Sequence, residues 1–228
     1  MATDNSPKHI GFIMDGNRRW ARVKGKNAFF GHKAGTENVE KIIEEAAKKG
    51  IKYATFFVLS TENWKKRSKI ELAGLIKLLK FFIKSKRERL QKEKARLNIL
   101  GDISVFPVDL QKLLRETTEL LKNNSRIIVN VALNYGGRDE IIRAIEKALK
   151  TGEKITEKNF GDFLDTAGQP DSDLIIRTGA RNRTSNFLIW QAAYSEIYFS
   201  NTLWPDFDSK EFDKILEWYK DQRRTMGG

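Results

Sequence analysis

The 228-residue sequence contains no cysteine and only two histidines. Without cysteine, neither a disulfide nor a thiolate metal site can form, and two histidines are too few for a multi-histidine zinc site. No apolar run approaches the roughly 20 residues that a membrane-spanning helix needs, and the first residues lack the apolar stretch of a signal peptide. We therefore expect a cytoplasmic protein.

Several familiar functional motifs are absent as well. The sequence has no GxxxxGK(S/T) phosphate loop, no GxGxxG dinucleotide fingerprint, no HExxH zinc motif and no GxSxG nucleophile elbow. Its Lys and Arg residues are dispersed and do not form the aromatic and basic signature of an RNA-binding domain. These absences argue against the corresponding enzyme classes, and we expect no nucleic-acid partner.

Positive charge is what the sequence has in excess. Lys and Arg number 42 against 30 Asp and Glu, which gives a formal net charge of +12, while 40% of the residues are hydrophobic. The hydrophobic share is enough for a packed core. The charge has four interpretations, namely a solvated surface, a polyanionic partner, a phosphorylated substrate or an anionic membrane face.

Strand and helix patterns alternate along the chain, which predicts one α/β domain over residues 1–228 with a mostly parallel central sheet flanked by helices. Residues 1–8 are expected to be flexible, and 152–172 to form a long irregular connection. Apolar runs predict strands at 9–15, 53–60, 96–100, 126–134, 173–178 and 195–200. Helical spacing predicts helices at 35–50, 69–95, 108–123, 138–150, 186–194 and 209–222.

Polar clusters directly follow the predicted strands. They occupy residues 15–20, 60–67, 134–140 and 177–186. Because the carboxyl ends of parallel strands line one crevice, where ligands bind, we expect these four clusters to converge on one site.

The first cluster, DGNRRW, combines Asp15 with Arg18 and Arg19 ahead of a predicted helix. Free backbone N–H groups and two arginines form a good anion site. Asp15 would repel an anion unless a cation lay between them, and Mg²⁺ is typically held by one or two carboxylates plus substrate phosphates. The alternative is that Asp15 only caps the helix and pairs with the arginines.

The last cluster, RTGARNRTSN, supplies three arginines and several hydroxyls. Arg177, Arg181 and Arg183 with the hydroxyls of Thr178, Thr184 and Ser185 suit a diphosphate better than a lone carboxylate. The alternative is a basic loop on a basic protein, although the apolar strand that precedes it delivers Arg177 from the interior of the sheet.

Two further candidates, His32 and the STENW segment, each have a functional and a structural interpretation. His32 of GHKAG stands at the predicted start of a helix, where it is either a structural donor or a phosphate ligand that positions a proton. In STENW, Ser60 and Asn63 offer hydroxyl and amide donors beside Trp64. The alternatives are that Thr61 only caps a helix and that Trp64 belongs to the core.

The segments HIGFIMDGNRRWA, GHKAG, STENW, NYGGR, DLIIRTG, RTSNFLIWQ, YSEIYF and LWPDF together resemble the cis-prenyltransferases, in the order and nearly at the spacing of that family. The resemblance covers the chain from about His9 to its end. It implies a homodimeric α/β fold that encloses an elongated apolar tunnel. It also implies that isopentenyl diphosphate condenses with an allylic diphosphate to give a Z-polyprenyl diphosphate and pyrophosphate.

The same resemblance implies roles for individual residues. Asp15 would bind Mg²⁺ on the allylic diphosphate, with Glu196 as a second metal-associated carboxylate, and Asn63 would lie near the reacting carbons. Arg177, Arg183 and Ser185 would hold isopentenyl diphosphate. The other implied substrate-binding residues are Gly16, Asn17, Arg18, Arg19, Trp20, His32, Ser60, Thr61, Glu62, Trp64, Arg67 and Thr184.

The chain departs from the family pattern at several positions. Ala28 occupies a position where many members have arginine, and Lys26 is a candidate substitute. One residue is inserted after Trp64, so that Arg67 takes the role of the usual arginine. Ala180 and Arg181 stand where Gly and Glu are common. The tail at 223–228 is one residue longer than the pattern, and either of its two arginines could cross a dimer interface.

Residues 69–95 form the most basic of the predicted helices. Between 77 and 96 the sequence has nine Lys or Arg against two Glu, beside an apolar stripe at helical spacing. The stripe predicts an amphipathic helix on the core, and the resemblance places it along the tunnel. A further hypothesis is that its basic face contacts anionic lipid.

The alternative to an active enzyme is a catalytically silent partner subunit of the same family. A silent subunit would be expected to have lost charged positions of the site, whereas this sequence keeps them. We therefore predict an active cis-prenyltransferase.

Overall fold

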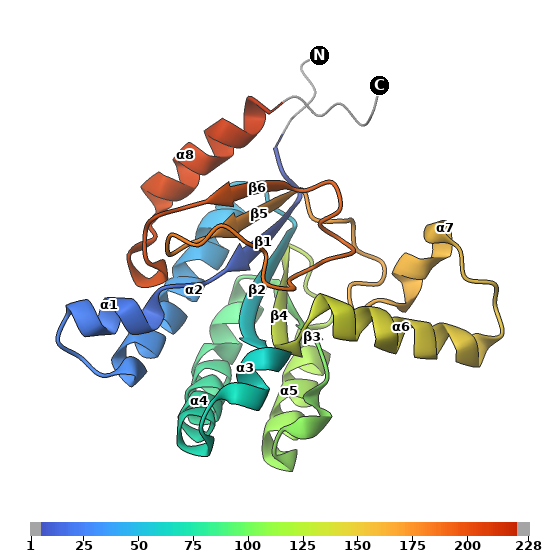
Figure 1. Cartoon of the computed structure of the whole chain (residues 1–228), viewed down its shortest axis with the longest axis horizontal. Helices are drawn as coiled ribbons and strands as arrows, with labels where there is room; N and C mark the ends of the chain where they lie inside the picture. The colour runs from blue at the N-terminus through green and yellow to red at the C-terminus, as the bar shows by residue number, and fades with distance from the viewer. Residues whose placement is uncertain (1–5, 223–228) are drawn as a thin grey trace.

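A computed structural model of the chain describes residues 6–222. Its centre is a six-stranded sheet in the order β3-β4-β2-β1-β5-β6 (Figure 1), and every neighbouring pair is parallel. The expectations for residues 1–5 and for the dimer-interface tail at 223–228 fall outside the described range. The strands are β1 His9–Ile13, β2 Tyr53–Ser60, β3 Ala95–Leu100, β4 Ile127–Tyr135, β5 Leu174–Arg177 and β6 Glu196–Phe199.

Helices connect the strands and cover the sheet. The longest is α4, with 24 residues, and Figure 1 shows it beside α5. The predicted alternation of strands and helices is confirmed, and all six strands lie within two residues of their predicted bounds. The helices are α1 Asn17–Val23, α2 Ala28–Lys48, α3 Thr61–Lys66, α4 Lys69–Lys92, α5 Val108–Leu121, α6 Gly137–Thr151, α7 Glu157–Phe160 and α8 Ser209–Lys220.

The sheet has a topological switch point between β1 and β5. The chain leaves β1 toward β2, β3 and β4 on one side, and then returns to the other side of β1 to form β5 and β6. In open parallel sheets, ligands bind beyond the carboxyl ends of the strands at such a point. The loops after β1 and β5, which carry Asp15 and Arg177, are therefore neighbours there.

The helix predicted at 35–50 is longer than expected and begins at Ala28. The side chain of Asn27 caps it by accepting hydrogen bonds from the backbone N–H groups of Phe29 and Phe30. Gly31 and Gly35, which suggested a helix start, lie inside the helix instead. A Cβ on Gly31 would lie 2.0 Å from the Asn17 carbonyl oxygen, so these glycines let α1 pack closely on α2.

The prediction of a helix at 186–194 is wrong, because this segment is a series of turns. Ser185, Asn186 and Leu188 have positive φ angles of 53°, 67° and 46°. Left-handed residues at such close intervals cannot continue an α-helix. The segment crosses the end of the sheet, and the Asn186 carbonyl accepts a 2.7 Å hydrogen bond from the N–H of Gly137 at the start of α6.

The core has clusters on both faces of the sheet. On one face, Ile10 and Phe12 of β1 pack with Ile42 of α2 and with Phe212 of α8, and the adjoining cluster of Leu133 with residues of α4 and α5 lies on the same face. Ala132 packs on the opposite face. α2 and α4 also contact each other, and many apolar side chains line the space between the sheet and these two helices.

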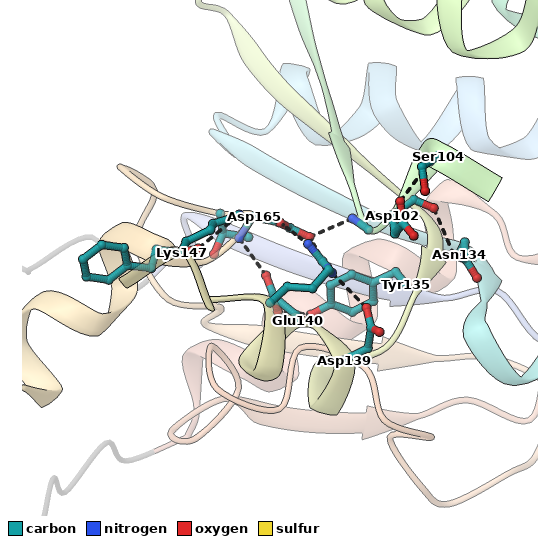
Figure 2. Close-up of polar contacts among 12 residues, drawn as sticks. Asp102, Ser104, Asn134, Tyr135, Asp139, Glu140, Lys147 and Asp165 are labelled. Carbon is teal, nitrogen blue, oxygen red and sulfur yellow. Dashed lines mark hydrogen bonds and ion pairs between the residues drawn. The ribbon is translucent and has the colours of Figure 1, made fainter. Parts of the chain in front are cut away.

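A buried polar group on α6, which we call the Glu140 cluster, joins that helix to the irregular connection (Figure 2). It comprises Tyr135, Glu140, Arg143, Asp165 and Gln191. Tyr135 Oη donates to Glu140 Oε2 at 2.5 Å, and Gln191 Nε2 donates to Glu140 as well. Arg143 donates two hydrogen bonds to Asp165, at 2.8 and 2.6 Å.

Candidate active site

The switch point of the sheet brings Asp15 and Arg177 into contact. Arg177 is 4% exposed, and its Nη2 donates to Asp15 Oδ2 at 3.1 Å. A second cation approaches the same carboxylate, because Arg19 Nη2 lies 3.4 Å from Asp15 Oδ1. Asp15 itself is one-third exposed, so its carboxylate is held by two guanidinium groups and still faces open space.

Asp15 is not a helix cap, which corrects one of the two interpretations of DGNRRW. The N-cap of α1 is Gly16, with a φ of 113° and no side-chain cap. Only glycine adopts this conformation without strain, and a Cβ here would also lie 2.8 Å from Leu203. Thr178 holds the loop in place, since its Oγ1 accepts from the N–H of Asp15 at 3.1 Å and donates to the Asp15 carbonyl at 2.9 Å.

The loop after β5 forms a second cationic group next to the first. Arg177 Nη1 donates to Ser185 Oγ and to the Arg183 carbonyl, both at 2.6 Å, and Arg183 Nε donates to Ser185 Oγ at 3.3 Å. Burial lowers the pKa of Arg177, an effect that Asp15 opposes and that Arg183 and Arg181 reinforce. The local excess of positive charge is the electrostatic condition for an anionic ligand.

His32 lies on α2 at the opening of the same site. Burial, followed by the charge of Arg67, lowers its pKa to about 4 despite the opposing charge of Glu71. At neutral pH the imidazole is therefore uncharged. Arg67 and Arg18 both approach Glu71, at 3.4 and 3.6 Å.

The STENW segment forms the end of β2 and the short helix α3. Its N-cap is Ser60, which corrects the expectation for Thr61, because Ser60 Oγ accepts from the N–H of Asn63 at 3.1 Å. Trp64 packs edge-on against Phe106 with ring centroids 5.0 Å apart, as the core interpretation expected. Asn63 is directed to the cavity described next.

These side chains surround the mouth of a cavity of about 940 Å³ that continues between the sheet, α2 and α4. Along α4 its lining runs from Leu75 to Leu90, which at the helical rise corresponds to about 22 Å. The mouth is polar and the remainder is apolar. The polar lining residues are Asp15, Asn17, Arg18, Arg19, His32, Thr36, Ser60, Glu62, Asn63, Lys66, Arg67, Arg177, Arg183, Ser185 and Asn186.

Several buried polar atoms at the mouth have no hydrogen-bond partner within the described part of the chain. They are Asn17 Oδ1, His32 Nε2, Arg67 Nη1 and Arg177 Nε. Buried polar groups in native proteins are normally satisfied, because each unmade hydrogen bond costs about 1–3 kcal/mol. Their concentration at one cavity mouth indicates a site that a polar ligand completes.

The structure does not bring every predicted residue to this mouth. Glu196 begins β6 opposite Leu174, three positions before the pair formed by Arg177 and Phe199, and it does not line the cavity. Trp20 Nε1 donates to Asp206 at 2.7 Å, away from the lining. Thr61, Trp64 and Thr184 are also absent from the lining.

The substitution at Ala28 is not offset by Lys26. The ammonium group of Lys26 lies over the ring of Phe30, 5.4 Å from its centroid, and Lys26 does not line the cavity. Arg67, by contrast, does line the mouth, in line with the role given to it after the one-residue insertion.

Some lining residues were missed from the sequence. Thr36 follows GHKAG directly, and Asn186 ends the RTSN segment. Asn186 Nδ2 donates to Glu62 at 3.0 Å, and its Oδ1 accepts from the N–H of Arg138. Gly136 leaves the room for it, since a Cβ there would lie 2.6 Å from Asn186 Nδ2. In the sequence, NYGGR and RTSN both belong to polar clusters that follow predicted strands, and this shared position was the available signal.

Two carboxylates line the mouth, Asp15 and Glu62, and Glu62 accepts a hydrogen bond from Asn186. Among residues 6–222, no group of three or more His, Cys, Asp or Glu side chains forms a metal site by itself. Asp15 alone, one-third exposed beside cationic side chains, fits an ion that takes one or two carboxylates and completes its shell with water and substrate phosphates. That is the usual coordination of Mg²⁺.

Within the described residues, no helix has the length and apolar composition needed to cross a bilayer. The helix α4 is long, but its many lysines and arginines make it too polar to cross a bilayer. Fold and site thus define an α/β protein with a cationic group at the switch point of its sheet, which suits an anion, and an adjoining cavity with an apolar lining, which suits an apolar group.

Comparison with known proteins extends this description. The family model for undecaprenyl diphosphate synthases matches residues 13–227. The chain is 45% identical to an isoprenyl transferase of Fusobacterium nucleatum over 98% of its length and 97% of that protein. It is 42% identical to a ditrans,polycis-undecaprenyl-diphosphate synthase of Buchnera aphidicola, described as specific for (2E,6E)-farnesyl diphosphate, over 97% and 91% of the two chains.

Solved structures agree. The lavandulyl diphosphate synthase of Lavandula x intermedia, solved with dimethylallyl diphosphate, matches with a TM-score of 0.93 and 32% identity over 99% of this chain and all of that one. A probable undecaprenyl diphosphate synthase of Campylobacter jejuni matches with a TM-score of 0.85 and 34% identity over 97% and 99%. The chain belongs to the undecaprenyl diphosphate synthase family, which confirms its resemblance to the cis-prenyltransferases and its class as a prenyl-transferring enzyme.

Proposed function

We propose that this chain condenses isopentenyl diphosphate with an allylic diphosphate, forms a cis double bond, and releases pyrophosphate and a Z-polyprenyl diphosphate. The observation that carries the proposal is the composition of the cavity. Cationic and unsatisfied polar groups surround its mouth, and apolar side chains line the remainder. A diphosphate joined to a hydrocarbon chain matches both parts at once.

The allylic diphosphate is assigned to the loop after β1. Its phosphates would approach Asn17, Arg19 and the N-terminal N–H groups of α1, where anions are favoured. Asp15 would hold Mg²⁺ against them, and the bound ion would stabilise the negative charge that develops on the departing pyrophosphate. Arg19 and neutral His32 would add donors that are already in position.

Isopentenyl diphosphate is assigned to the loop after β5. Arg177, Arg183 and Ser185 already form a hydrogen-bonded group, so little reorganisation is needed when the diphosphate binds. Asn63 would orient the substrate where its proton leaves. With the two substrates held side by side, the C–O bond of the allylic diphosphate breaks as the new C–C bond forms, and the entropic cost of their encounter has been met by binding.

An assay with the purified chain tests this proposal. Radiolabelled isopentenyl diphosphate is incubated with geranyl or farnesyl diphosphate and Mg²⁺, and the products are extracted and separated by chain length. We expect label in polyprenyl diphosphates, its loss with EDTA and its return with Mg²⁺. Absence of labelled product with every starter would contradict the proposal and favour the silent-subunit alternative.

Three further parts of the proposal concern the oligomeric state, the location and a second carboxylate for the metal. We expect a homodimer, which sedimentation equilibrium measures. The cytoplasmic location stays a prediction. Glu196 retains its implied association with the metal as a proposal, tested by comparing the Mg²⁺ dependence of Glu196→Gln with that of the unmodified chain.

The outer face of α4 is assigned to lipid contact. Lys77 and Lys84 are exposed there, together with Phe81, which is 64% exposed. Not every basic side chain of α4 is available to lipid, however, because Lys80 forms an ion pair with Asp109 on α5. Flotation with anionic but not neutral liposomes is expected, and equal retention on both would contradict the assignment.

A further inference from the structure

A small second hollow lies at the apolar end of the cavity. It measures about 30 Å³ and lies between α2 and α4, above the first residues of β3 and β4. Phe82 and Leu90 line both this hollow and the main cavity, so they are the wall between the two. Its other apolar sides include Ile43 and Ala47 of α2 and Ala95 of β3.

Ion pairs close this hollow on the outside. Glu40 Oε2 lies 2.7 Å from Lys86 Nζ, Glu40 Oε1 lies 2.7 Å from Arg89 Nη1, and Glu44 pairs with Arg89 Nη2. All four side chains line the hollow. We call them the α2–α4 clasp, because the acids come from α2 and the bases from α4.

The seam between α2 and α4 is weakly held compared with the rest of the core. Side chains there enclose a hollow where a close-packed interior would have few voids. In the clasp, the basic side chain of Arg89 is half exposed, whereas the carboxylates of Glu40 and Glu44 are 16% and 27% exposed, so the ion pairs lie at the boundary between core and solvent. Because of the hollow, we expect that opening this seam costs less than opening the packed core at Phe12 or Val129, which line neither cavity.

The position of the seam gives it a role in the proposed reaction. The diphosphate is held at the mouth, and new five-carbon units are added there, so the far end of the product is pushed along α4 toward Leu90. When the main cavity is full, that end meets Phe82 and Leu90. Beyond them lies the hollow, and beyond the hollow lies the clasp.

We propose that the α2–α4 seam is the port through which the far end of a long product leaves the cavity, and that Glu40, Glu44, Lys86 and Arg89 thereby set product length. The proposal rests on the prenyl-transfer function proposed above. It assigns chain-length selection to side chains on the far side of the cavity from the reacting atoms.

The test compares product lengths between the unmodified chain and the double variant Glu40→Gln/Glu44→Gln, which keeps side-chain size and removes both charges. We expect the main product to lengthen by at least one five-carbon unit while the initial rate of label incorporation changes less than twofold. Arg89→Gln should act in the same direction from the other helix. Asp109→Asn is the matched control, because it breaks the ion pair between α4 and α5 without touching the hollow, and its product should be unchanged.

Filling the hollow provides the opposite test. Ala47→Phe, added to the double variant, should block the port and return the product to its original length. Unchanged product length in Glu40→Gln/Glu44→Gln and in Arg89→Gln, with both variants folded by circular dichroism, would overturn the port. That result differs from failure of the proposed function, in which the unmodified chain makes no product at all.

Discussion

Two groups of buried polar side chains in this protein look alike in composition and differ in completeness. The Glu140 cluster and the cavity mouth each combine arginine, carboxylate and amide groups. In the Glu140 cluster, Glu140 accepts from Tyr135 and from the N–H of Asp165 (Figure 2). It also accepts from Gln191. Among the described residues, the Glu140 cluster has one buried polar side-chain atom without a hydrogen-bond partner, Gln191 Oε1. The cavity mouth has several such atoms.

The difference separates a structural group from a binding site. Burial raises the pKa of Glu140 even though Tyr135 and Gln191 oppose the shift. Burial would raise the pKa of Asp165 too, but hydrogen bonds and charge from Arg143 outweigh it and hold that pKa low. Each shift has its compensating partner inside the chain. At the mouth, Asp15 and Glu71 oppose the pKa shifts only in part. Arg177 Nε, Arg67 Nη1 and His32 Nε2 still lack hydrogen-bond partners among the described residues, and a ligand would supply them.

The largest expected effect comes from removing the carboxylate at the mouth. Asp15→Ala should lower kcat about 10³-fold, because charge stabilisation in the transition state is lost with the metal contact. The chain should still fold, since Asp15 is partly exposed and lies outside the strands, although loss of the ion pair with buried Arg177 should lower its stability. Steady-state kinetics at saturating Mg²⁺ measure the first quantity and thermal unfolding measures the second.

The conservative variant sharpens this test. Asp15→Asn keeps the size of the side chain and removes its charge, so it should be nearly as inactive as Asp15→Ala. Retention of most activity by either variant at saturating Mg²⁺ would contradict a metal role for Asp15.

The complementary change breaks the satisfied cluster. Arg143→Met leaves the carboxylate of Asp165, which is 10% exposed, without its bidentate partner. Stability should fall by about 3 kcal/mol, the usual cost of breaking a buried pair. Urea unfolding measures the loss, and kcat per folded molecule should stay within about twofold of the unmodified chain.

An exposed pair supplies the control for that variant. Lys122→Met removes the partner of Glu119 on the surface of α5, where ion pairs contribute less than about 1 kcal/mol. If Arg143→Met lowered kcat as strongly as Asp15→Ala, the separation between structural and binding groups would fail.

A smaller effect is expected within the mouth itself. Arg183→Ala removes one guanidinium from the isopentenyl diphosphate site, and loss of one charged hydrogen bond should raise the KM for that substrate about 10-fold. The KM for the allylic substrate should change much less. The reverse order of the two KM changes would show that the two diphosphate sites are exchanged.

Much of this architecture could be predicted from sequence, because buried parallel strands appear as continuous apolar runs. Convergence of the loops after β1 and β5 followed from the same reasoning. The contact between Asp15 and Arg177 did not, since these residues are 162 positions apart and neither segment signals the other. The Glu140 cluster was missed for the same reason, as its members come from four separate segments.

The prediction of an irregular connection at 152–172 missed the short helix α7, which the side chain of Thr156 caps. The two larger errors in secondary structure have a common cause. At 186–194 and at the start of α2, local patterns were overridden by close packing against the site. Ser185 and Asn186 adopt positive φ angles to reach Arg177 and Gly137, and Gly31 and Gly35 sit inside a helix to make room for Asn17. Local sequence propensity carries no information about such tertiary contacts. Places where the structure departs from the local propensity therefore mark the functional end of the sheet.

The smallest expected effect uses the only two histidines of the chain. Burial lowers the pKa of both, but their partners differ. The ring nitrogens of His9 contact the Pro170 carbonyl at 2.9 Å and Thr55 Oγ1 at 2.7 Å, whereas His32 Nε2 has no hydrogen-bond partner among the described residues. In the free protein, neither imidazole should titrate near pH 6.5, and NMR can follow each through its own resonance.

Adding inorganic pyrophosphate with Mg²⁺ should separate the two signals. A bound anion favours the protonated imidazole, so the pKa of His32 should rise from about 4, while that of His9 stays where it was. The lowered pKa values of the two histidines change stability in the same direction. As the pH falls, the unfolded chain binds protons at these histidines before the folded chain does, and this favours unfolding. Stability is therefore lost as pH falls from about 6.5 toward 4, and pyrophosphate should reduce the part of that loss due to His32. Equal responses of the two histidines would mean that the unsatisfied nitrogen does not mark the binding site.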